Sequence, residues 1–192
     1  AQGYKENDPM GGYDPYSSSK GCAELVASSY RRSFLQEQGI GLASVRAGNV
    51  IGGGDWAEDR LIPDLIKSFQ SNNQVEIRNP NAIRPWQHVI EPLSGYIQLA
   101  ELLTKDGAKY AEAWNFGPVE EDARPVEWIV DKLSYLWGSE LGWNKDDSPQ
   151  PHEAHYLKLD CNKAFERLNW KPKWSLEEAL LKIVEWHKEE QL

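Results

Sequence analysis

Two residues able to carry out proton chemistry lie close together near the start of the chain. Tyr16 and Lys20 are four positions apart, a spacing that places two side chains on the same face of a helix, one turn from each other. A free phenol has a pKa of about 10 and is a poor base at neutral pH, but a neighbouring ammonium group favours the phenolate. Such a tyrosine can take a proton from a sugar or alcohol hydroxyl while a hydride leaves for a nicotinamide.

The residues around this pair predict the helix that would position it. Pro15 suits a first helical turn because it lacks an N–H and has a fixed φ, and Asp14 is a candidate N-cap. Apolar and small residues recur after it with a roughly helical period, and this face holds Cys22, Leu25, Val26, Ser29, Tyr30 and Phe34. We expect a helix over residues 15–38 with Cys22 as a buried free thiol. The spacing is also compatible with a surface helix that carries a neighbouring tyrosine and lysine.

The composition is that of an ordinary globular protein, with 192 residues, 40% of them hydrophobic and 27% charged. The formal net charge of −9 argues against a general nucleic-acid-binding surface. No apolar run approaches the roughly 20 residues needed to cross a bilayer. The two cysteines, Cys22 and Cys161, are far apart and lack metal-ligand spacing. We therefore expect no nucleic-acid or membrane partner, no metal site, and a reducing, cytoplasmic setting.

Helical and strand patterns alternate along the chain and predict an α/β protein with a parallel sheet. A short buried strand at residues 40–46 follows the first helix, as in one half of a βαβ unit. Further strands are expected at residues 75–78, 83–90, 113–118 and 155–159, and further helices at residues 59–70, 91–105, 125–137, 160–168 and after 175. Asp160 is expected to cap one of these helices, and Ser175 with Glu178 to form a capping box on the last. Residues 138–151 are expected to be a polar loop.

A glycine-rich stretch between Arg46 and Trp56 follows the first predicted strand. In open α/β sheets, ligands bind beyond the carboxyl ends of the strands. Glycines at this point allow close backbone approach and unusual φ/ψ angles. No glycine-rich turn opens a helix here, so the stretch is not a dinucleotide fingerprint, and a plain glycine-rich loop remains the alternative.

Three phrases of the chain, taken in order, resemble the extended short-chain dehydrogenase/reductase family. They are Tyr-Ser-Ser-Ser-Lys-Gly-Cys-Ala-Glu at 16–24, Arg-Ala-Gly-Asn-Val-Ile-Gly at 46–52 and Arg-Pro-Trp-Gln-His-Val at 84–89. The resemblance covers essentially the whole chain. Within the family, these phrases and Gly-Gly-Gly-Asp-Trp at 52–56 look most like the nucleotide-sugar 4,6-dehydratases that act on CDP-glucose.

The resemblance implies a reaction and roles for six residues. Tyr16 would deprotonate the 4-hydroxyl of glucose as hydride passes from C4 to NAD, water would leave across C5 and C6, and the hydride would return to C6. The product would be a 4-keto-6-deoxy sugar nucleotide, an early precursor of bacterial surface polysaccharides. Lys20 would hold the nicotinamide ribose and assist Tyr16, and Asn49 would lie by the sugar. The nucleotide diphosphate would be served by Arg60, Arg84 and His155.

Alternatives to these roles stay open for the basic residues. An arginine fork suits a diphosphate because it offers paired N–H donors, but Arg84 could equally belong to a surface ion pair. His152 and His155 are not near enough to a third ligand in the sequence to suggest a metal site. A histidine that is hydrogen-bonded or solvated is therefore the default interpretation of His155.

The resemblance also implies the fold class, which is α/β. We expect the C-terminal part of a Rossmann-like extended short-chain dehydrogenase/reductase fold plus a small α+β substrate-binding domain. Residues 1–58 would be the remnant of the Rossmann domain, and residues 59–192 mostly the substrate-binding domain, with a return to the Rossmann part at about 83–118. In the family, the glycine fingerprint and five strands precede the catalytic helix.

We expect this chain to lack that N-terminal NAD-binding half. Because the upstream parts also carry acid/base residues, we expect no turnover by this chain alone and little affinity for NAD. The inner faces of helix 15–38 and strand 40–46 would then be uncovered, leaving an exposed apolar surface. A homodimer is expected through the same helix. The alternatives are another NAD-dependent epimerase or dehydratase that acts on UDP-, dTDP- or GDP-sugars, and a non-catalytic nucleotide-sugar-binding module.

Overall fold

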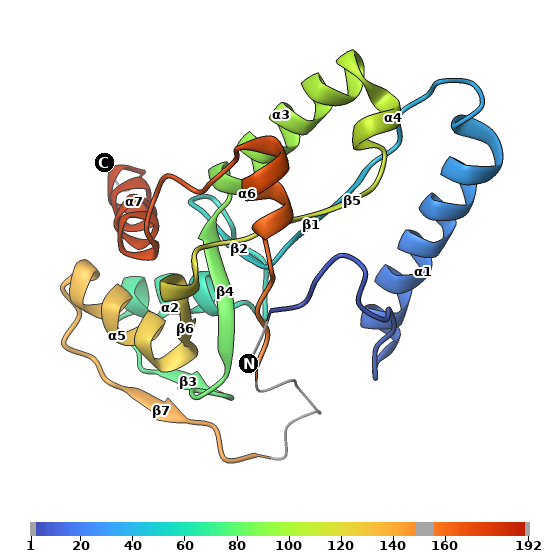
Figure 1. The fold of residues 1–192 in the computed structure, drawn as a ribbon. Helices are drawn as coiled ribbons and strands as arrows, with labels where there is room; N and C mark the ends of the chain where they lie inside the picture. The colour runs from blue at the N-terminus through green and yellow to red at the C-terminus, as the bar shows by residue number, and fades with distance from the viewer. Residues whose placement is uncertain (1–2, 149–155, 191–192) are drawn as a thin grey trace. The chain divides into compact units, whose positions relative to one another are not determined.

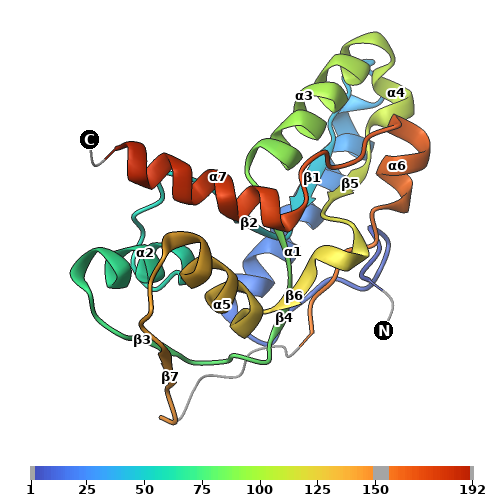
Figure 2. The same cartoon turned by 90° about the vertical axis from the view of Figure 1, so that its left-hand side faces the viewer.

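The computed structural model describes residues 3–148 and 156–190 of the chain. The chain divides into two compact units, each made of three separate segments (Figures 1 and 2). Unit 1 comprises Ala1–Ala47, Pro92–Phe116 and Leu159–Lys171, and unit 2 comprises Gly48–Glu91, Gly117–Lys158 and Pro172–Leu192.

Unit 1 is built on two parallel strands, β1 and β5, with Arg46 opposite Asn115 in the register. Three helices cover one side of these strands, while α1 lies on the other side (Figure 1). The elements are α1 (Pro15–Tyr30), β1 (Ser44–Ala47), α3 (Ile90–Lys105), α4 (Gly107–Tyr110), β5 (Ala113–Phe116) and α6 (Asn162–Leu168). The core between the strands and α3, α4 and α6 contains Leu99, Tyr110, Trp114, Phe116, Ala164, Leu168 and Trp170.

The first helix begins as predicted, but its end and its packing differ from the prediction. Asp14 is the N-cap and Pro15 the first helical residue, and the α-helix gives way to a π-helical turn at Arg31–Leu35. The prediction that Cys22 is buried is wrong, because its side chain is exposed and no residue of α1 is buried. The strand that follows is also shorter than expected, running over Ser44–Ala47.

Unit 2 has a three-stranded sheet in the order β2-β4-β6, in which β2 pairs parallel and β6 antiparallel to β4. A separate parallel pair joins β3 to β7. The elements are β2 (Asn49–Ile51), α2 (Leu61–Ser71), β3 (Val75–Ile77), β4 (Ile83–His88), a 3-10 turn (Glu120–Asp122), β6 (Ala123–Pro125), α5 (Val126–Trp137), β7 (Trp143–Lys145) and α7 (Leu176–Glu189). The apolar faces of α2, α5 and α7 meet around Trp86 in one core.

The assignments of three short segments need correction. Asn49–Ile51 is a strand rather than part of a glycine-rich loop, because the backbone of Ile51 accepts a hydrogen bond from Val89 and its side chain enters the core. Trp143–Lys145 forms β7 inside the stretch expected to be a loop. At residues 155–159 only isolated bridges form, at Tyr156 and Leu159, and residue 155 lies outside the described residues. Segments this short have too few residues for a periodic pattern to be read.

The caps of the last two helices are partly as expected. Ser175 and Glu178 form the predicted capping box at the start of α7. In α6 the N-cap position is Cys161 rather than Asp160, although an Asp160 carboxylate oxygen still accepts a hydrogen bond from the Asn162 backbone N–H at 3.0 Å. Among the described residues, no helix is both long and apolar enough to span a membrane.

Gly95 provides a test of how tightly unit 1 is packed. A Cβ at this position would lie 2.3 Å from two ring atoms of Phe116, and the adjoining Trp170 is held by a hydrogen bond to Ser94 at 2.9 Å. We expect Gly95→Ala to destabilise unit 1, because overpacking costs about 1–3 kcal/mol, more than the ~1 kcal/mol that alanine gains over glycine in a helix.

Hydrogen exchange of peptides from α3 and α6 measures this effect. Glu101→Ala, at an exposed position of the same helix, is the control. Hydrogen exchange that is unchanged or slower in Gly95→Ala would contradict the prediction, because it would show that the rings of Phe116 and Trp170 shift without loss of stability.

Candidate functional site

The Tyr16–Lys20 pair lies on one face of α1, as its spacing predicts. The Lys20 ammonium nitrogen is 5.0 Å from the centre of the Tyr16 ring, within the range of a cation–π contact. The Tyr16 side chain is 71% exposed, so its hydroxyl is accessible to a ligand. The structure therefore brings together the phenol expected to take the proton and the ammonium expected to assist it.

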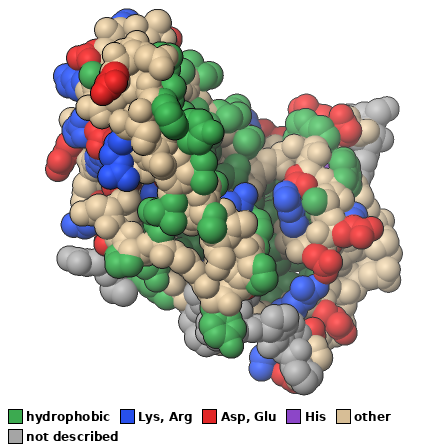
Figure 3. Space-filling view, turned by 90° about the vertical axis from the view of Figure 1, so that its right-hand side faces the viewer, with side chains coloured by type: hydrophobic (Ala, Val, Ile, Leu, Met, Phe, Trp, Pro, Cys, Tyr) green, Lys and Arg blue, Asp and Glu red, His purple; other side chains and the backbone are tan. Residues whose placement is uncertain are grey.

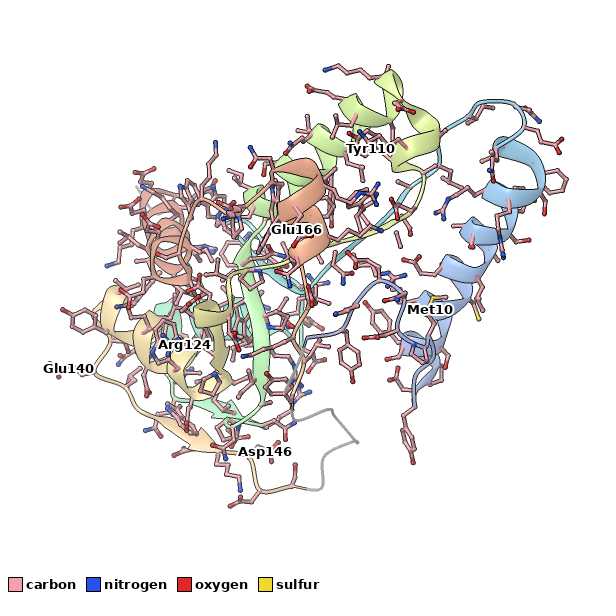
Figure 4. The ribbon with its side chains drawn as sticks, in the orientation of Figure 1. Met10, Tyr110, Arg124, Glu140, Asp146 and Glu166 are labelled. Carbon is pink, nitrogen blue, oxygen red and sulfur yellow. The ribbon has the colours of Figure 1, made fainter. Side chains whose placement is uncertain are left out.

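The first turn of α1 is fixed by hydrogen bonds around Tyr16. The Asp14 carboxylate accepts from the Ser17 backbone N–H at 2.9 Å and from the Ser17 hydroxyl at 2.7 Å. These bonds lower the pKa of Asp14 below its ordinary value. The Ser19 hydroxyl donates to the Tyr16 carbonyl at 2.7 Å. Met10, labelled in Figure 4, lies beside this end of the helix. The serines around Tyr16 thus order the turn that carries the phenol.

One ion pair attaches α1 to β1. Glu24 accepts a hydrogen bond from the Arg46 guanidinium at 2.8 Å and another from the Ser44 hydroxyl at 2.6 Å. Arg46 also donates to the Glu6 backbone carbonyl at 3.2 Å. The bond from Arg46 lowers the pKa of Glu24, and the same bond raises the pKa of Arg46. Both side chains are largely shielded from solvent, so the pair connects the helix, the strand and the N-terminal segment.

The apolar residues of α1 and its π-helical turn face solvent in this chain. Leu25, Val26, Tyr30 and Phe34 are each more than half exposed, and Figure 3 shows hydrophobic side chains in a band on the face that α1 occupies in Figure 1. Ile40 and Val45 are exposed as well. The prediction of an uncovered apolar surface on this helix and strand is confirmed.

Three of the four expected substrate residues lie in unit 2. Asn49 is the first residue of β2 and half-buried, opposite Trp86 of β4. Arg84 is only 6% exposed and donates to the Ile83 carbonyl at 2.9 Å. Arg60 occupies the N-cap position of α2, with an exposed side chain paired to Asp55 at 3.1 Å. The fourth residue, His155, lies outside the described residues.

One basic residue beside Arg84 was not found from the sequence. The register of the antiparallel pair places Arg124 of β6 directly opposite Arg84 of β4, and directly opposed side chains leave a sheet on the same face. Arg124, labelled in Figure 4, lies with its guanidinium carbon 5.3 Å from the ring centre of Trp128. Only the pairing of strands far apart in the chain reveals this neighbour, so no local spacing could have predicted it.

Among residues 3–148 and 156–190, no three His, Cys, Asp or Glu side chains are placed to hold a metal ion together.

The parallel α/β arrangement and the Tyr–Lys pair at the start of a helix define the class of protein: a part of an extended short-chain dehydrogenase/reductase. The family model described as GDP-mannose 4,6 dehydratase matches residues 1–183. The chain therefore belongs to the GDP-mannose 4,6 dehydratase family.

Relatives and solved structures agree with this assignment. The chain is 64% identical over 191 residues to CDP-glucose 4,6-dehydratase of Salmonella typhimurium. The matched region covers 97% of this chain and 53% of the relative. It is 23% identical over 189 residues to dTDP-glucose 4,6-dehydratase of Streptomyces antibioticus, covering 97% of this chain and 52% of that protein. The chain thus spans about half the length of the curated relatives it matches.

Two solved structures support the fold. The UDP-glucuronic acid 4-epimerase of Bacillus cereus, in complex with UDP-glucuronic acid and NAD, superposes with a TM-score of 0.83 at 22% identity, covering 98% of this chain and 57% of that one. The dTDP-glucose 4,6-dehydratase DesIV of Streptomyces venezuelae, with NAD bound, superposes with a TM-score of 0.81 at 19% identity. The match covers 100% of this chain and 56% of that one.

Removing the Glu24 charge tests the attachment of α1. We expect Glu24→Gln to weaken the contact of α1 with β1 by about 1–3 kcal/mol, because it leaves Arg46 without its charged partner. Hydrogen exchange in α1 measures the loss, and Glu37→Gln, at an exposed position beyond the helix, is the matched control.

The same pair predicts a pH dependence. Because the pKa of Glu24 is lowered in the folded chain from the ordinary 4.5, its stabilising contribution is present above about pH 4.5 and is lost as the pH falls through the lowered value. The difference in α1 exchange between the native chain and Glu24→Gln should therefore shrink on acidification below pH 4.5. A difference that stays constant to pH 2 would contradict the ion-pair attachment.

Proposed function

We propose that this chain provides the proton-transfer pair and the substrate-binding residues of a nucleotide-sugar 4,6-dehydratase that acts on CDP-glucose. The observation that carries the proposal is the Tyr16–Lys20 pair, with the lysine 5.0 Å from the tyrosine ring on a capped helix. The 64% identity to the Salmonella relative supports CDP-glucose as the substrate. The reaction converts CDP-glucose to CDP-4-keto-6-deoxyglucose and water.

In this reaction Tyr16 acts as the base at the 4-hydroxyl of the sugar. Its phenolate takes the hydroxyl proton while hydride leaves C4, and the resulting ketone acidifies the proton at C5. Water then leaves across C5 and C6, hydride would be returned to C6, and a proton would be returned to C5. NAD supplies the hydride acceptor and donor. A positive charge near the phenol stabilises the phenolate, which is the role of Lys20.

The residues present fit a nicotinamide cofactor at this helix. Tyr16 is 71% exposed and Lys20 is exposed as well, so a phenol and an ammonium are both available to ribose hydroxyls. An ammonium with three donors suits that contact. Tyr16 and Lys20 are therefore the proposed cofactor-binding residues of this chain.

The diphosphate of the substrate is assigned to the basic residues of unit 2. Arg84 is shielded from water, and guanidinium–phosphate bonds are stronger where solvent is excluded. Arg60 offers a second guanidinium at the start of α2, and Asn49 would contact the sugar. His155 is retained as a proposed phosphate contact.

The remaining assignments rest on the family. The Rossmann remnant at residues 1–58 and the substrate-binding domain at residues 59–192 stay predictions, as do the homodimer and the cytoplasmic location. The exposed Leu25, Val26, Tyr30 and Phe34 support self-association, because an apolar surface of this kind is commonly covered by a partner.

Calorimetry with nucleotide sugars tests the substrate. We expect this chain to bind CDP-glucose and CDP more tightly than the dTDP and GDP counterparts, and Arg84→Gln to weaken CDP binding by about tenfold through loss of its charged hydrogen bonds. Arg84→Lys keeps the positive charge but removes the paired N–H donors, so it shows which of the two the binding needs. Equal affinity for all three nucleotides would remove the support for a CDP-sugar, and binding of none would overturn the proposal.

Catalysis is tested in a hybrid enzyme in which this chain replaces the matching residues of the Salmonella relative. The hybrid should convert CDP-glucose with loss of water, detected by mass spectrometry. Tyr16→Phe should lower the rate by roughly 10²–10⁴-fold, the usual contribution of a positioned base. Tyr13→Phe, which changes a neighbouring exposed phenol, is the matched control. A hybrid that binds CDP-glucose yet shows no turnover would favour a non-catalytic binding module.

A further inference from the structure

Two arginines near the start of α2 each pair with an aspartate. Arg60 lies 3.1 Å from Asp55, and Arg78 lies 2.6 Å from Asp59. Arg78 directly follows β3, and Asp59 directly precedes Arg60 in the chain. All four residues belong to unit 2, so the Asp59–Arg78 pair lies next to the arginine proposed to hold the diphosphate.

The two pairs differ in what they leave available. Asp55 uses one oxygen for Arg60 and the other for the Ala57 backbone N–H at 3.1 Å, so both oxygens are engaged. Asp59 accepts from Arg78 through Oδ1 only. In the described part of the chain, its Oδ2 and the other N–H groups of Arg78 make no hydrogen bond. These side chains are 76% and 56% exposed, so the remaining atoms can meet a ligand.

Asp59 is held in an uncommon backbone conformation at this point. Its φ is +58°, a left-handed value that few residues other than glycine adopt. Asp59 precedes Arg60, the N-cap of α2, and from there its carboxylate pairs with Arg78. The pair therefore offers a carboxylate and a guanidinium at a defined place beside the start of α2.

The unused atoms of the pair are one carboxylate oxygen of Asp59, which can accept, and the remaining guanidinium N–H groups of Arg78, which can donate. The Watson–Crick edge of cytosine presents the reverse, with the N4 amino group as donor followed by the N3 and O2 acceptors. A carboxylate accepting from cytosine N4 and a guanidinium donating in paired fashion are both established ways of reading bases. Uracil and thymine carry an acceptor at O4 and a donor at N3, so they would oppose both groups.

We propose that Asp59 and Arg78 form the part of the site that recognises cytosine and distinguishes CDP-sugars from UDP- and dTDP-sugars. This inference rests on the proposed function, which assigns the diphosphate to Arg60 and the neighbouring basic residues. A carboxylate oxygen at this position repels phosphate but accepts from an amino group, which favours the base as the occupant. A nucleotide bound through Arg60 would have the pair within reach of its remaining part, because Asp59 adjoins Arg60 in the chain.

Calorimetric titration of this chain with CDP and UDP tests the inference, because the two ligands share the diphosphate and ribose and differ in the base. The native chain should prefer CDP. Arg78→Gln should lower the CDP/UDP affinity ratio by about tenfold, the usual worth of one paired base contact. The matched control is Lys145→Gln, since Lys145 and Asp147 form an exposed ion pair of similar exposure at the partner strand β7. The control should leave the ratio unchanged.

A second variant keeps the test decisive if Arg78→Gln destabilises the chain. In Asp59→Asn, the new amide can offer either its oxygen to cytosine N4 or its N–H to uracil O4, and asparagine tolerates a positive φ. We therefore expect this variant to gain UDP affinity with little loss of CDP affinity.

The outcomes separate this inference from the proposed function. A native chain that binds no nucleotide contradicts the proposed function. A native chain that binds CDP and UDP equally, or variants that weaken both ligands by the same factor, overturns the cytosine assignment while leaving the nucleotide-binding role intact.

Discussion

The Glu24–Arg46 ion pair is the interaction on which the position of α1, the helix that carries Tyr16 and Lys20, depends. None of the residues of α1 is buried, so apolar packing contributes little to its attachment in this chain. Glu24 instead joins the helix to β1 through Arg46 and Ser44, and Arg46 reaches the N-terminal segment at Glu6. Partly shielded charges interact more strongly than exposed ones. This pair therefore stabilises the attachment of α1 more than a surface ion pair of the same length would.

The two units are stabilised in different ways. Unit 2 encloses an apolar core in which Leu65, Leu180 and Ile183 have no exposed surface, and such burial is the main favourable contribution to folding. The strands of unit 1 have a comparable core on one side only, where Trp114 and Phe116 are fully buried. On the other side, polar contacts take the place of packing, and the apolar side chains of α1 remain exposed. The attachment of α1, which carries Tyr16 and Lys20, thus depends on charge rather than on apolar packing.

Local sequence signals predicted the features that depend on neighbours in the chain. The cap at Asp14, the proximity of Tyr16 and Lys20 and the capping box at Ser175 all follow from spacings of three or four residues. The burial of Cys22 was wrongly predicted for the converse reason. A helical period identifies an apolar face, but whether that face is covered depends on segments distant in the sequence. Short strands such as β2 and β7 escaped prediction because their pairing partners, and not their own pattern, define them.

The same distinction applies to the residues proposed for catalysis and for recognition. Tyr16 and Lys20 are brought together by their spacing over one helical turn. The groups proposed to contact the nucleotide come from separate elements: Arg84 lies on β4, whereas Asp59 precedes α2 and pairs with Arg78, which follows β3. Substitutions at such positions can alter which base is accepted without disturbing the helix. A fold shared at 19–22% identity with a dTDP-sugar dehydratase and a UDP-sugar epimerase is compatible with this separation, because recognition residues from independent elements can change one at a time.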